Sequence, residues 1–247
     1  MRIHIIACRV LTRELSKQVA DSDNTIGISY LPQGLHDRPA ILHQQMIEEL
    51  ERLYDQIEKG YMKRVPDYIV MGYGLCSKST VGLEAKKIPL VIPRTEDCIA
   101  LFLGSQERYL RYFYEYPGTF WMNRDWVNNL PDIDPDYEQT LYQKYLEEYE
   151  DEDTAEYLMQ VHRDSLKNYK MIGFIKSSSV GRDDTERERA KAYADRYRFE
   201  YKEFEGNSGM LEKIVQGKFD EKEFLIVPPG HKVEFTNGPE RIAAVKA

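Results

Sequence analysis

The sequence predicts an α/β fold in which a mostly parallel sheet is flanked by helices, and a helical insertion separates two halves. Short apolar runs alternate with longer amphipathic stretches, which is the order of elements expected of a parallel α/β sheet. The run "DYIVMGYG" at 67–74 is almost continuously apolar, as expected of a strand buried on both faces. The alternation stops near residue 119 and resumes near residue 170, which places the insertion.

The first half, residues 1–118, reads as strand, helix, strand, helix, strand, helix. Apolar residues at helical spacing predict a helix over 39–60, with Pro39 in its first turn and Gly60 as its stop. Before it, residues 25–40 combine a short apolar stretch with a loop. The other predicted elements are a strand at 2–10, a strand at 67–74, a short helix or turn at 80–87, a strand ending at Pro93, and an aromatic-rich helix at 99–116.

Residues 119–169 are the predicted insertion. The stretch 116–126 reads as loop or strand, and 135–168 reads as wholly helical. Its acidic run "EEYEDEDTAE" indicates a solvated connection between helices rather than a metal site. The second half, residues 170–247, contains predicted strands at 170–178, 199–206 and 223–230 and helices at 183–197 and 208–217. We predict a single α/β unit over 1–247, with two separate domains as the alternative.

Charge, apolar runs and cysteine count argue against several classes of protein, namely nucleic-acid-binding, membrane-spanning and disulfide-bonded secreted proteins. The 247 residues carry a net charge of -8, which argues against a nucleic-acid partner because neutralising phosphates needs clustered Lys and Arg. No segment approaches the roughly 20 apolar residues of a membrane span, and the run before Cys8 is too short for a signal sequence. We therefore expect a cytoplasmic protein, in which three cysteines do not form a disulfide framework.

The three cysteines occupy equivalent places in the predicted sheet. Cys8 ends the first strand, Cys76 follows the strand at 67–74, and Cys98 follows the strand that ends at Pro93. Ligands of open α/β sheets bind outside the carboxyl ends of the strands. The alternative is three inert core thiols, because free cysteine is among the most buried residue types. Three thiols at matching strand ends, with none elsewhere, favour a shared site on one rim.

A metal centre is the chemistry that three thiolates would serve. Zinc bound by three protein ligands keeps a fourth position open, and an iron–sulfur cluster bound by three cysteines leaves one iron open. His4, His36 and His231 are candidates for a fourth ligand, although a single histidine more often has a core or loop role.

Residues beside the cysteines suit such a site. Gly72 and Gly74 would let the backbone approach a ligand, or would serve tight packing instead. Arg94 could bind a carboxylate or phosphate, and Glu96 could act as a general acid or base. We expect Tyr73 and His36 to line the open side with them. Asp97 could also act as a general acid or base, but it is at least as well explained as a helix N-cap.

Five blocks in order, "YLPQGLHDRP", "GYGLC", "PRTEDCIALFLGS", "YPGTFW" and "LIVPPGH", resemble an uncharacterised bacterial and archaeal domain-of-unknown-function family. The resemblance covers nearly the whole chain except the acidic middle region. It implies that the motif cysteines correspond to Cys8, Cys76 and Cys98 and the loop histidine to His36. Members are often encoded beside corrinoid-dependent methyltransferases, which implies a setting in the one-carbon metabolism of anaerobes.

These observations lead to one hypothesis and two rivals. The hypothesis is a metal-binding or iron–sulfur protein of corrinoid-linked methyl transfer, demethylation or sulfur metabolism, which is an enzyme if the open position takes a small-molecule substrate. A [4Fe–4S] cluster with one open iron is favoured over zinc, because no fourth ligand is evident and the implied setting is anaerobic. The first rival is a non-catalytic module that docks on a corrinoid protein or methyltransferase. The second is a metal-free enzyme with a thiolate at Cys76 or Cys98, activated by Arg94 or His36.

Overall fold

Residue contacts divide the chain into two compact units, and each is described by itself. The computed structural model describes residues 1–129, 137–177 and 180–247. The first unit consists mainly of Met1–Leu110 and Gly206–Ala247, and the second of Arg111–Ser177 and Gly181–Glu205. The predicted boundaries at residues 118 and 169, and the prediction of a single unit, stay predictions.

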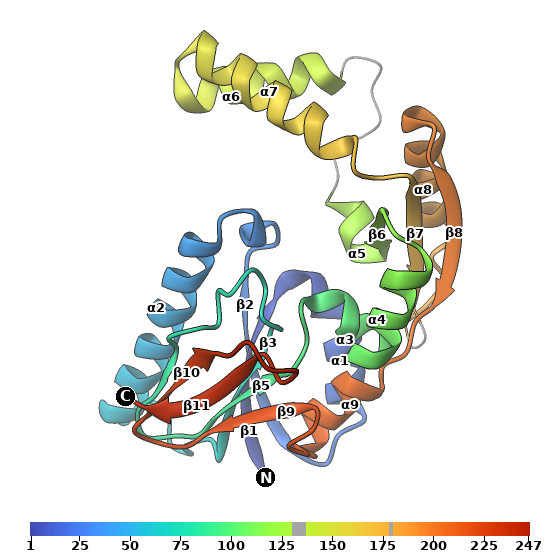
Figure 1. Ribbon diagram of the computed structural model, residues 1–247. Helices are drawn as coiled ribbons and strands as arrows, with labels where there is room; N and C mark the ends of the chain where they lie inside the picture. Colours follow the sequence, from blue (N-terminus) through green and yellow to red (C-terminus); the bar gives the residue numbers. More distant parts are fainter. Residues whose placement is uncertain (130–136, 178–179) are drawn as a thin grey trace. The chain divides into compact units, whose positions relative to one another are not determined.

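The first unit is built on a five-stranded sheet with the order β2-β1-β3-β5-β9 (Figure 1). Neighbouring strands are parallel except β5 and β9, which are antiparallel. This confirms the predicted α/β class with its mostly parallel sheet. The five strands are β1 (Arg2–Cys8), β2 (Thr25–Leu31), β3 (Tyr68–Gly72), β5 (Leu90–Pro93) and β9 (Phe224–Val227).

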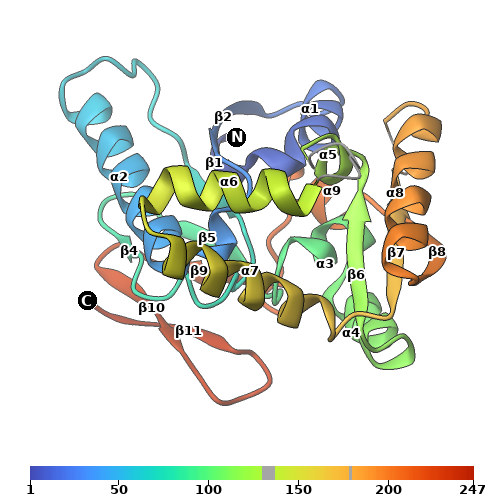
Figure 2. The same cartoon turned by 90° about the horizontal axis from the view of Figure 1, so that it is seen from above.

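Helices cover both faces of this sheet. Figures 1 and 2 show α2 on one side, and α1, α3 and α9 on the other. The α2 helix starts at Pro39, as predicted, and buries a stripe at helical spacing that includes Leu42, Met46 and Leu50. The helices of this part are η1 (Arg9–Leu11), α1 (Thr12–Ala20), η2 (Leu35–Asp37), α2 (Pro39–Glu58), α3 (Cys98–Leu103) and α9 (Gly209–Gln216), and α4 (Gln106–Glu115) belongs to it as far as Leu110.

Three local features differ from the sequence-based expectation. The predicted helix over 99–116 is two helices, because Gly104 takes a left-handed conformation (φ 84°) that ends α3. Helix α1 follows β1 after the short η1 and was not predicted. Two further strands, β10 and β11, follow the strand that we expected to be the last, and they form a small antiparallel sheet with β4, which lies in the stretch 80–87 predicted as a short helix or turn. The strands of this sheet are β4 (Glu84–Ala85), β10 (His231–Phe235) and β11 (Ile242–Lys246).

The second unit has its own parallel sheet with the order β6-β7-β8. Its core joins these strands to α8 and α5 through buried apolar side chains such as Phe174, Val127 and Ala190. The helical pair α6 and α7 lies within the stretch 119–169 of the predicted insertion, together with β6 and α5, and residues 130–136 before the pair lie outside the described part. The elements are β6 (Thr119–Asn123), α5 (Arg124–Asn128), α6 (Tyr137–Tyr149), α7 (Glu152–Leu166), β7 (Met171–Lys176), α8 (Asp184–Tyr197) and β8 (Glu200–Glu205).

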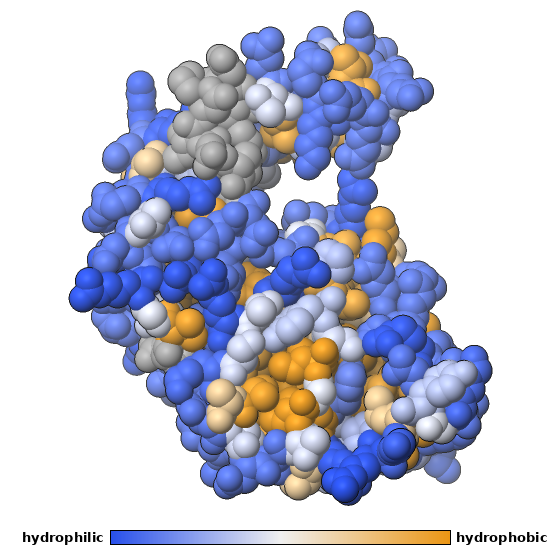
Figure 3. Space-filling view, turned by 180° about the vertical axis from the view of Figure 1, so that it is seen from behind, coloured by the Kyte–Doolittle hydropathy of each residue, from blue (hydrophilic) through white to orange (hydrophobic). Residues whose placement is uncertain are grey.

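The surface carries mainly polar residues. In the view from behind, charged and polar residues surround one patch of apolar residues (Figure 3). Among the described residues, no helix combines the length and apolar character that crossing a membrane would require.

Candidate functional site

The strand order of the first unit reverses at β1 and β3, and the candidate site lies there. The chain passes from β1 to β2 on one side of β1 and then returns to β3 on the other side. Ala7 of β1 pairs with Gly72 of β3, so that Cys8 and Tyr73 follow the last paired residues at the carboxyl edge. Such a switch point is where open α/β sheets bind ligands.

Two loops meet beside this edge. The segment after β3 lies against the segment after β5, since Leu75 N donates to Thr95 O at 2.7 Å and Cys76 N donates to Glu96 O at 2.8 Å. A Cβ atom at position 74 would lie 2.3 Å from the Thr95 hydroxyl, so that only glycine permits this approach.

Gly72 has a packing role comparable to that of Gly74. A Cβ atom at position 72 would lie 2.6 Å from the Cβ of Ala7. Both glycines therefore serve close packing of neighbouring segments of chain, and this is the packing alternative that the sequence left open.

The chain then makes an unusual turn. Cys76, Ser77 and Lys78 have φ values of 44°, 57° and 67°, which places three consecutive non-glycine residues in the left-handed region. Each such residue costs about 1–2 kcal/mol relative to a right-handed conformation. The Cys76 carbonyl holds the turn by accepting from the Ser79 hydroxyl at 2.7 Å and from Ser79 N at 3.1 Å. Backbone strain of this kind concentrates at functional sites.

Burial dominates the electrostatics of the site, and neighbouring thiols and a carboxyl group add to its effect. Burial, followed by the neighbouring Cys8, Cys76 and Cys98 thiols, raises the pKa of Tyr73. Burial and then Asp97 raise the pKa of Cys76 and of Cys98, and burial raises that of Cys8. No basic side chain is among the main influences on these groups. The thiols and the phenol therefore stay protonated at neutral pH.

Asp97 is held in place from two directions. One oxygen of its carboxyl group accepts from Ile99 N at 2.8 Å, which confirms the N-cap interpretation of this residue. The other oxygen accepts from the Tyr109 hydroxyl at 3.1 Å. Burial raises the pKa of Asp97, and burial and then Asp97 raise the pKa of Tyr109. The pair forms the polar end of the site.

Two buried polar atoms here lack a hydrogen-bond partner among the described residues. They are the hydroxyl oxygens of Tyr73 and Thr95, whose residues are only 3% and 4% exposed. After burial, the Cys8 thiol has the largest influence on the pKa of Tyr73, although it does not meet hydrogen-bond geometry with the Tyr73 hydroxyl. Because buried hydroxyls are nearly always satisfied, each of these two atoms calls for a physical explanation.

The prediction of a three-cysteine metal or iron–sulfur centre is wrong. In the described part of the chain, no group of three or more His, Cys, Asp or Glu side chains is arranged to hold a metal ion. The three thiols come from three different segments, and Cys8 and Cys76 are buried; although all three influence Tyr73, they do not form such a group. The choice between a [4Fe–4S] cluster and zinc falls with this prediction.

The rival prediction of a reactive thiolate meets a physical obstacle. A reactive cysteine needs a lowered pKa and a nearby positive charge, whereas burial raises the pKa of all three thiols here.

The predicted polar partners have other contacts. The Arg94 guanidinium donates to the carbonyls of Ile242 at 2.6 Å and Glu240 at 3.2 Å, so it anchors the C-terminal strand pair. Glu96 accepts from Arg241 at 2.9 Å. His36 lies in η2, with its ring nitrogen 3.4 Å from an Asp37 oxygen. No described contact joins His36 to the cysteines.

The candidate fourth ligands also have local partners. His4 Nε2 lies 2.9 Å from the Ser29 hydroxyl, and His231 Nδ1 lies 3.2 Å from the Pro229 carbonyl. Sequence reasoning missed Thr95 and Tyr109. Nothing local marks Thr95, and the spacing does not mark Tyr109 either, because it lies in α4 whereas Asp97 caps the separate helix α3.

Comparison with known proteins places this architecture in a family. No curated protein and no solved structure matches the chain. Residues 30–215 match the family described as "Protein of unknown function (DUF1638)", which is about three quarters of the chain and includes Tyr73, Asp97 and Tyr109. This agrees with the family resemblance of the sequence blocks, and the chain belongs to the DUF1638 family.

Proposed function

We propose that the protein binds a small molecule at the switch point between β1 and β3. The observation that carries the proposal is the Tyr73 hydroxyl, which is buried at that edge without a hydrogen-bond partner. A ligand with a hydrogen-bond acceptor would satisfy it. Thr95, whose hydroxyl lies against residue 74, would supply a second polar contact.

The charge of the site selects the class of ligand. Its titratable groups are thiols, phenols and a carboxyl group, and no basic side chain offsets them. An anion would be repelled by Asp97 when that group is ionised, and it would lack a cationic partner. A neutral amide or carbonyl compound, or an organic ammonium ion, suits the site. Phosphates and carboxylates do not.

The residues take distinct roles in this proposal. Tyr73 and Thr95 hydrogen-bond the ligand, and Asp97, oriented by Tyr109, receives its positive or donor end. The three cysteines form soft apolar walls, and Gly72 and Gly74 keep the segments close. Arg94 and Glu96 support the rim through the C-terminal strands, and a catalytic role for His36 stays a prediction.

The test is ligand-observed NMR with size-matched probes. Saturation-transfer spectra would be recorded for the full chain with trimethylammonium ion, acetamide and acetate as single probes. We expect signals from the first two and none from acetate. Tyr73→Phe should reduce the signals at least about fivefold, which corresponds to the loss of one hydrogen bond. Tyr61→Phe, at a residue 77% exposed, is the matched control.

Two outcomes would contradict the proposal. Acetate binding as well as the other probes would remove the electrostatic argument. Equal signals for wild type and Tyr73→Phe would mean that the buried hydroxyl does not contact the ligand.

The wider setting is proposed from the sequence resemblance alone. It comprises the cytoplasm of an anaerobe, with a corrinoid protein or a corrinoid-dependent methyltransferase as partner and source of the small molecule. Sedimentation velocity of the purified chain, mixed with a corrinoid protein encoded beside it, would test the partnership. Independent sedimentation at tens of micromolar would contradict it, without bearing on the site itself.

A further inference from the structure

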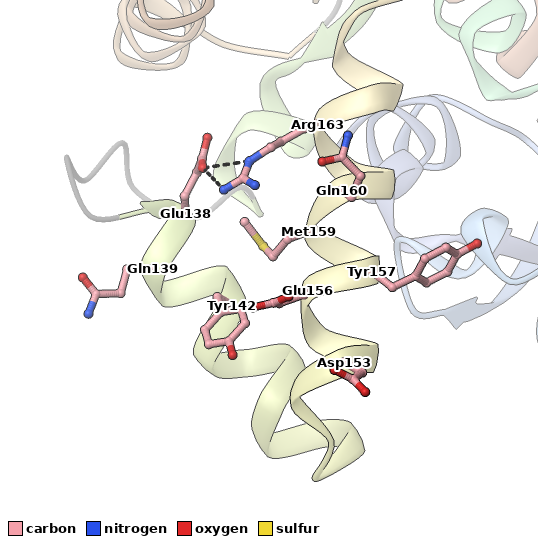
Figure 4. Close-up of a pocket in the computed structure, with 9 residues that line it drawn as sticks. All are labelled: Glu138, Gln139, Tyr142, Asp153, Glu156, Tyr157, Met159, Gln160 and Arg163. Atoms are coloured by element: carbon pink, nitrogen blue, oxygen red, sulfur yellow. Dashed lines mark hydrogen bonds and ion pairs between the residues drawn. The ribbon is translucent and has the colours of Figure 1, made fainter.

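The second unit carries a groove on the helical pair α6 and α7 (Figure 4). Its volume is about 610 Å³, and side chains of both helices line it. None of the switch-point residues contributes to it. The lining residues are Glu138, Gln139, Tyr142, Asp153, Glu156, Tyr157, Met159, Gln160 and Arg163.

The two helices leave apolar surface uncovered. None of the described side chains of α6 is buried, and α7 buries only Ala155 and Met159. Tyr157 is 67% exposed and Val161 is 45% exposed. Helices of globular proteins normally bury an apolar stripe against a neighbour, and a pair alone cannot cover both stripes. The pair therefore presents a surface that a further helix could complete.

The charge of this surface identifies what would complete it. Residues 137–168 contain nine carboxylate side chains and three Lys or Arg, a net charge of -6 within a chain whose total is -8. In the groove itself, Arg163 is engaged with Glu138 at 2.7 Å, so that Asp153 and Glu156 are left for a partner. Complementary charge steers association and fixes the partner's register.

We propose that this groove binds a basic amphipathic helix of another protein, with apolar side chains over Tyr142 and Tyr157. Lys or Arg side chains of that helix would meet Asp153 and Glu156. With a rise of 1.5 Å per residue, the 13 residues of α6 span about 20 Å, which matches a partner helix of three to four turns. The proposal concerns a surface separate from the switch-point site and does not depend on it.

A fluorescein-labelled peptide tests the proposal with the full chain. The probe is an 18-residue peptide of Leu and Lys, with Leu at helical spacing along one stripe. A peptide of the same composition without the stripe is the control. We expect fluorescence anisotropy to show binding of the striped peptide that is at least about tenfold tighter and weakens with added salt.

A charge-matched pair of variants locates the contact. Asp153→Asn with Glu156→Gln removes two groove carboxylates, and Glu147→Gln with Glu152→Gln removes two carboxylates of the same helices outside the groove. We expect the first pair to weaken binding about fivefold or more and the second to leave it within about twofold. Circular dichroism checks that both variants stay folded.

Three results would overturn the proposal. Equal affinity for the two peptides would show that charge alone drives binding. Equal losses in the two double variants would place the contact outside the groove. Self-association of the chain that the groove variant abolishes would identify a second copy of this chain as the occupant.

Discussion

Tyr73→Phe should stabilise the ligand-free protein, against the usual outcome for a buried tyrosine. The Tyr73 hydroxyl is buried without a hydrogen-bond partner among the described residues. A buried hydroxyl that has lost its water partners costs about 1–3 kcal/mol, and phenylalanine keeps the ring while removing that cost. The space left by one oxygen atom offsets part of the gain. We therefore expect the free energy of unfolding to rise by about 0.5–2 kcal/mol.

The two tryptophans allow the assay to separate the units. Trp121 and Trp126 both belong to the second unit, so that tryptophan fluorescence reports its unfolding alone. Urea unfolding followed by far-UV circular dichroism reports both units. The higher free energy of unfolding of Tyr73→Phe should appear in the dichroism transition. In thermal unfolding, an increase of 1 kcal/mol corresponds to a rise of about 2–4 °C in the melting temperature of a chain of this size.

Tyr109→Phe is the opposite case. The Tyr109 hydroxyl donates to Asp97 at 3.1 Å, so its removal leaves a buried carboxyl oxygen without that donor. We expect a loss of about 1.5–3 kcal/mol. A comparable loss in Tyr73→Phe would refute the reasoning, because it would show that the Tyr73 hydroxyl is satisfied in the free protein, and the proposed ligand contact would lose its basis.

Two further predictions concern packing and protonation. Gly74→Ala should destabilise the protein by about 2–4 kcal/mol in urea unfolding, since its Cβ would lie 2.3 Å from the Thr95 hydroxyl. Gly34→Ala, with a φ of 90° but no atom within 4 Å of its Cβ, should lose only about 1–2 kcal/mol, and equal losses would contradict the steric argument. Above the ordinary thiol pKa of about 8.5, the unfolded chain releases thiol protons that the native chain keeps, because burial raises the pKa of all three cysteines. Stability should therefore fall as the pH rises, by up to about 1.4 kcal/mol per pH unit for each thiol. Unfolding curves between pH 7 and 10 would measure this fall, and a triple Cys→Ala variant that keeps the same slope would show that other groups cause it.

The fold could be predicted where local pattern decides it. Strands such as β3 and β5 are apolar throughout because helices cover both faces of the sheet, and this pattern is visible without a structure. The α1 helix was missed because it has only nine residues, most of them polar. The antiparallel direction of β9 was not predictable, since direction depends on the path of the chain and not on the composition of the strand.

The site shows the same division between position and orientation. The predicted ends of the strands correctly placed Cys8 and Tyr73 at one edge of the sheet, because neighbouring parallel strands end at the same edge. They did not determine where the sulfurs point. Cys76 lies in a left-handed turn and Cys98 is the first residue of α3, and neither conformation follows from the strands before them. The metal prediction failed at this step.

Several unfavourable features of the first unit lie close together at one edge of the sheet. Three left-handed residues at about 1–2 kcal/mol each and two buried hydroxyls at about 1–3 kcal/mol each lie within the segments 73–78 and 95. The sheet around them, by contrast, packs apolar side chains such as Ile5, Val70 and Val91 that are fully buried. Proteins tolerate local violations of this kind mainly where function requires them. A ligand that hydrogen-bonds Tyr73 and Thr95 would remove the cost of both hydroxyls, and binding to the folded chain alone would add stability by mass action. The same residues therefore account for the strain of the free site and for the affinity of the occupied one.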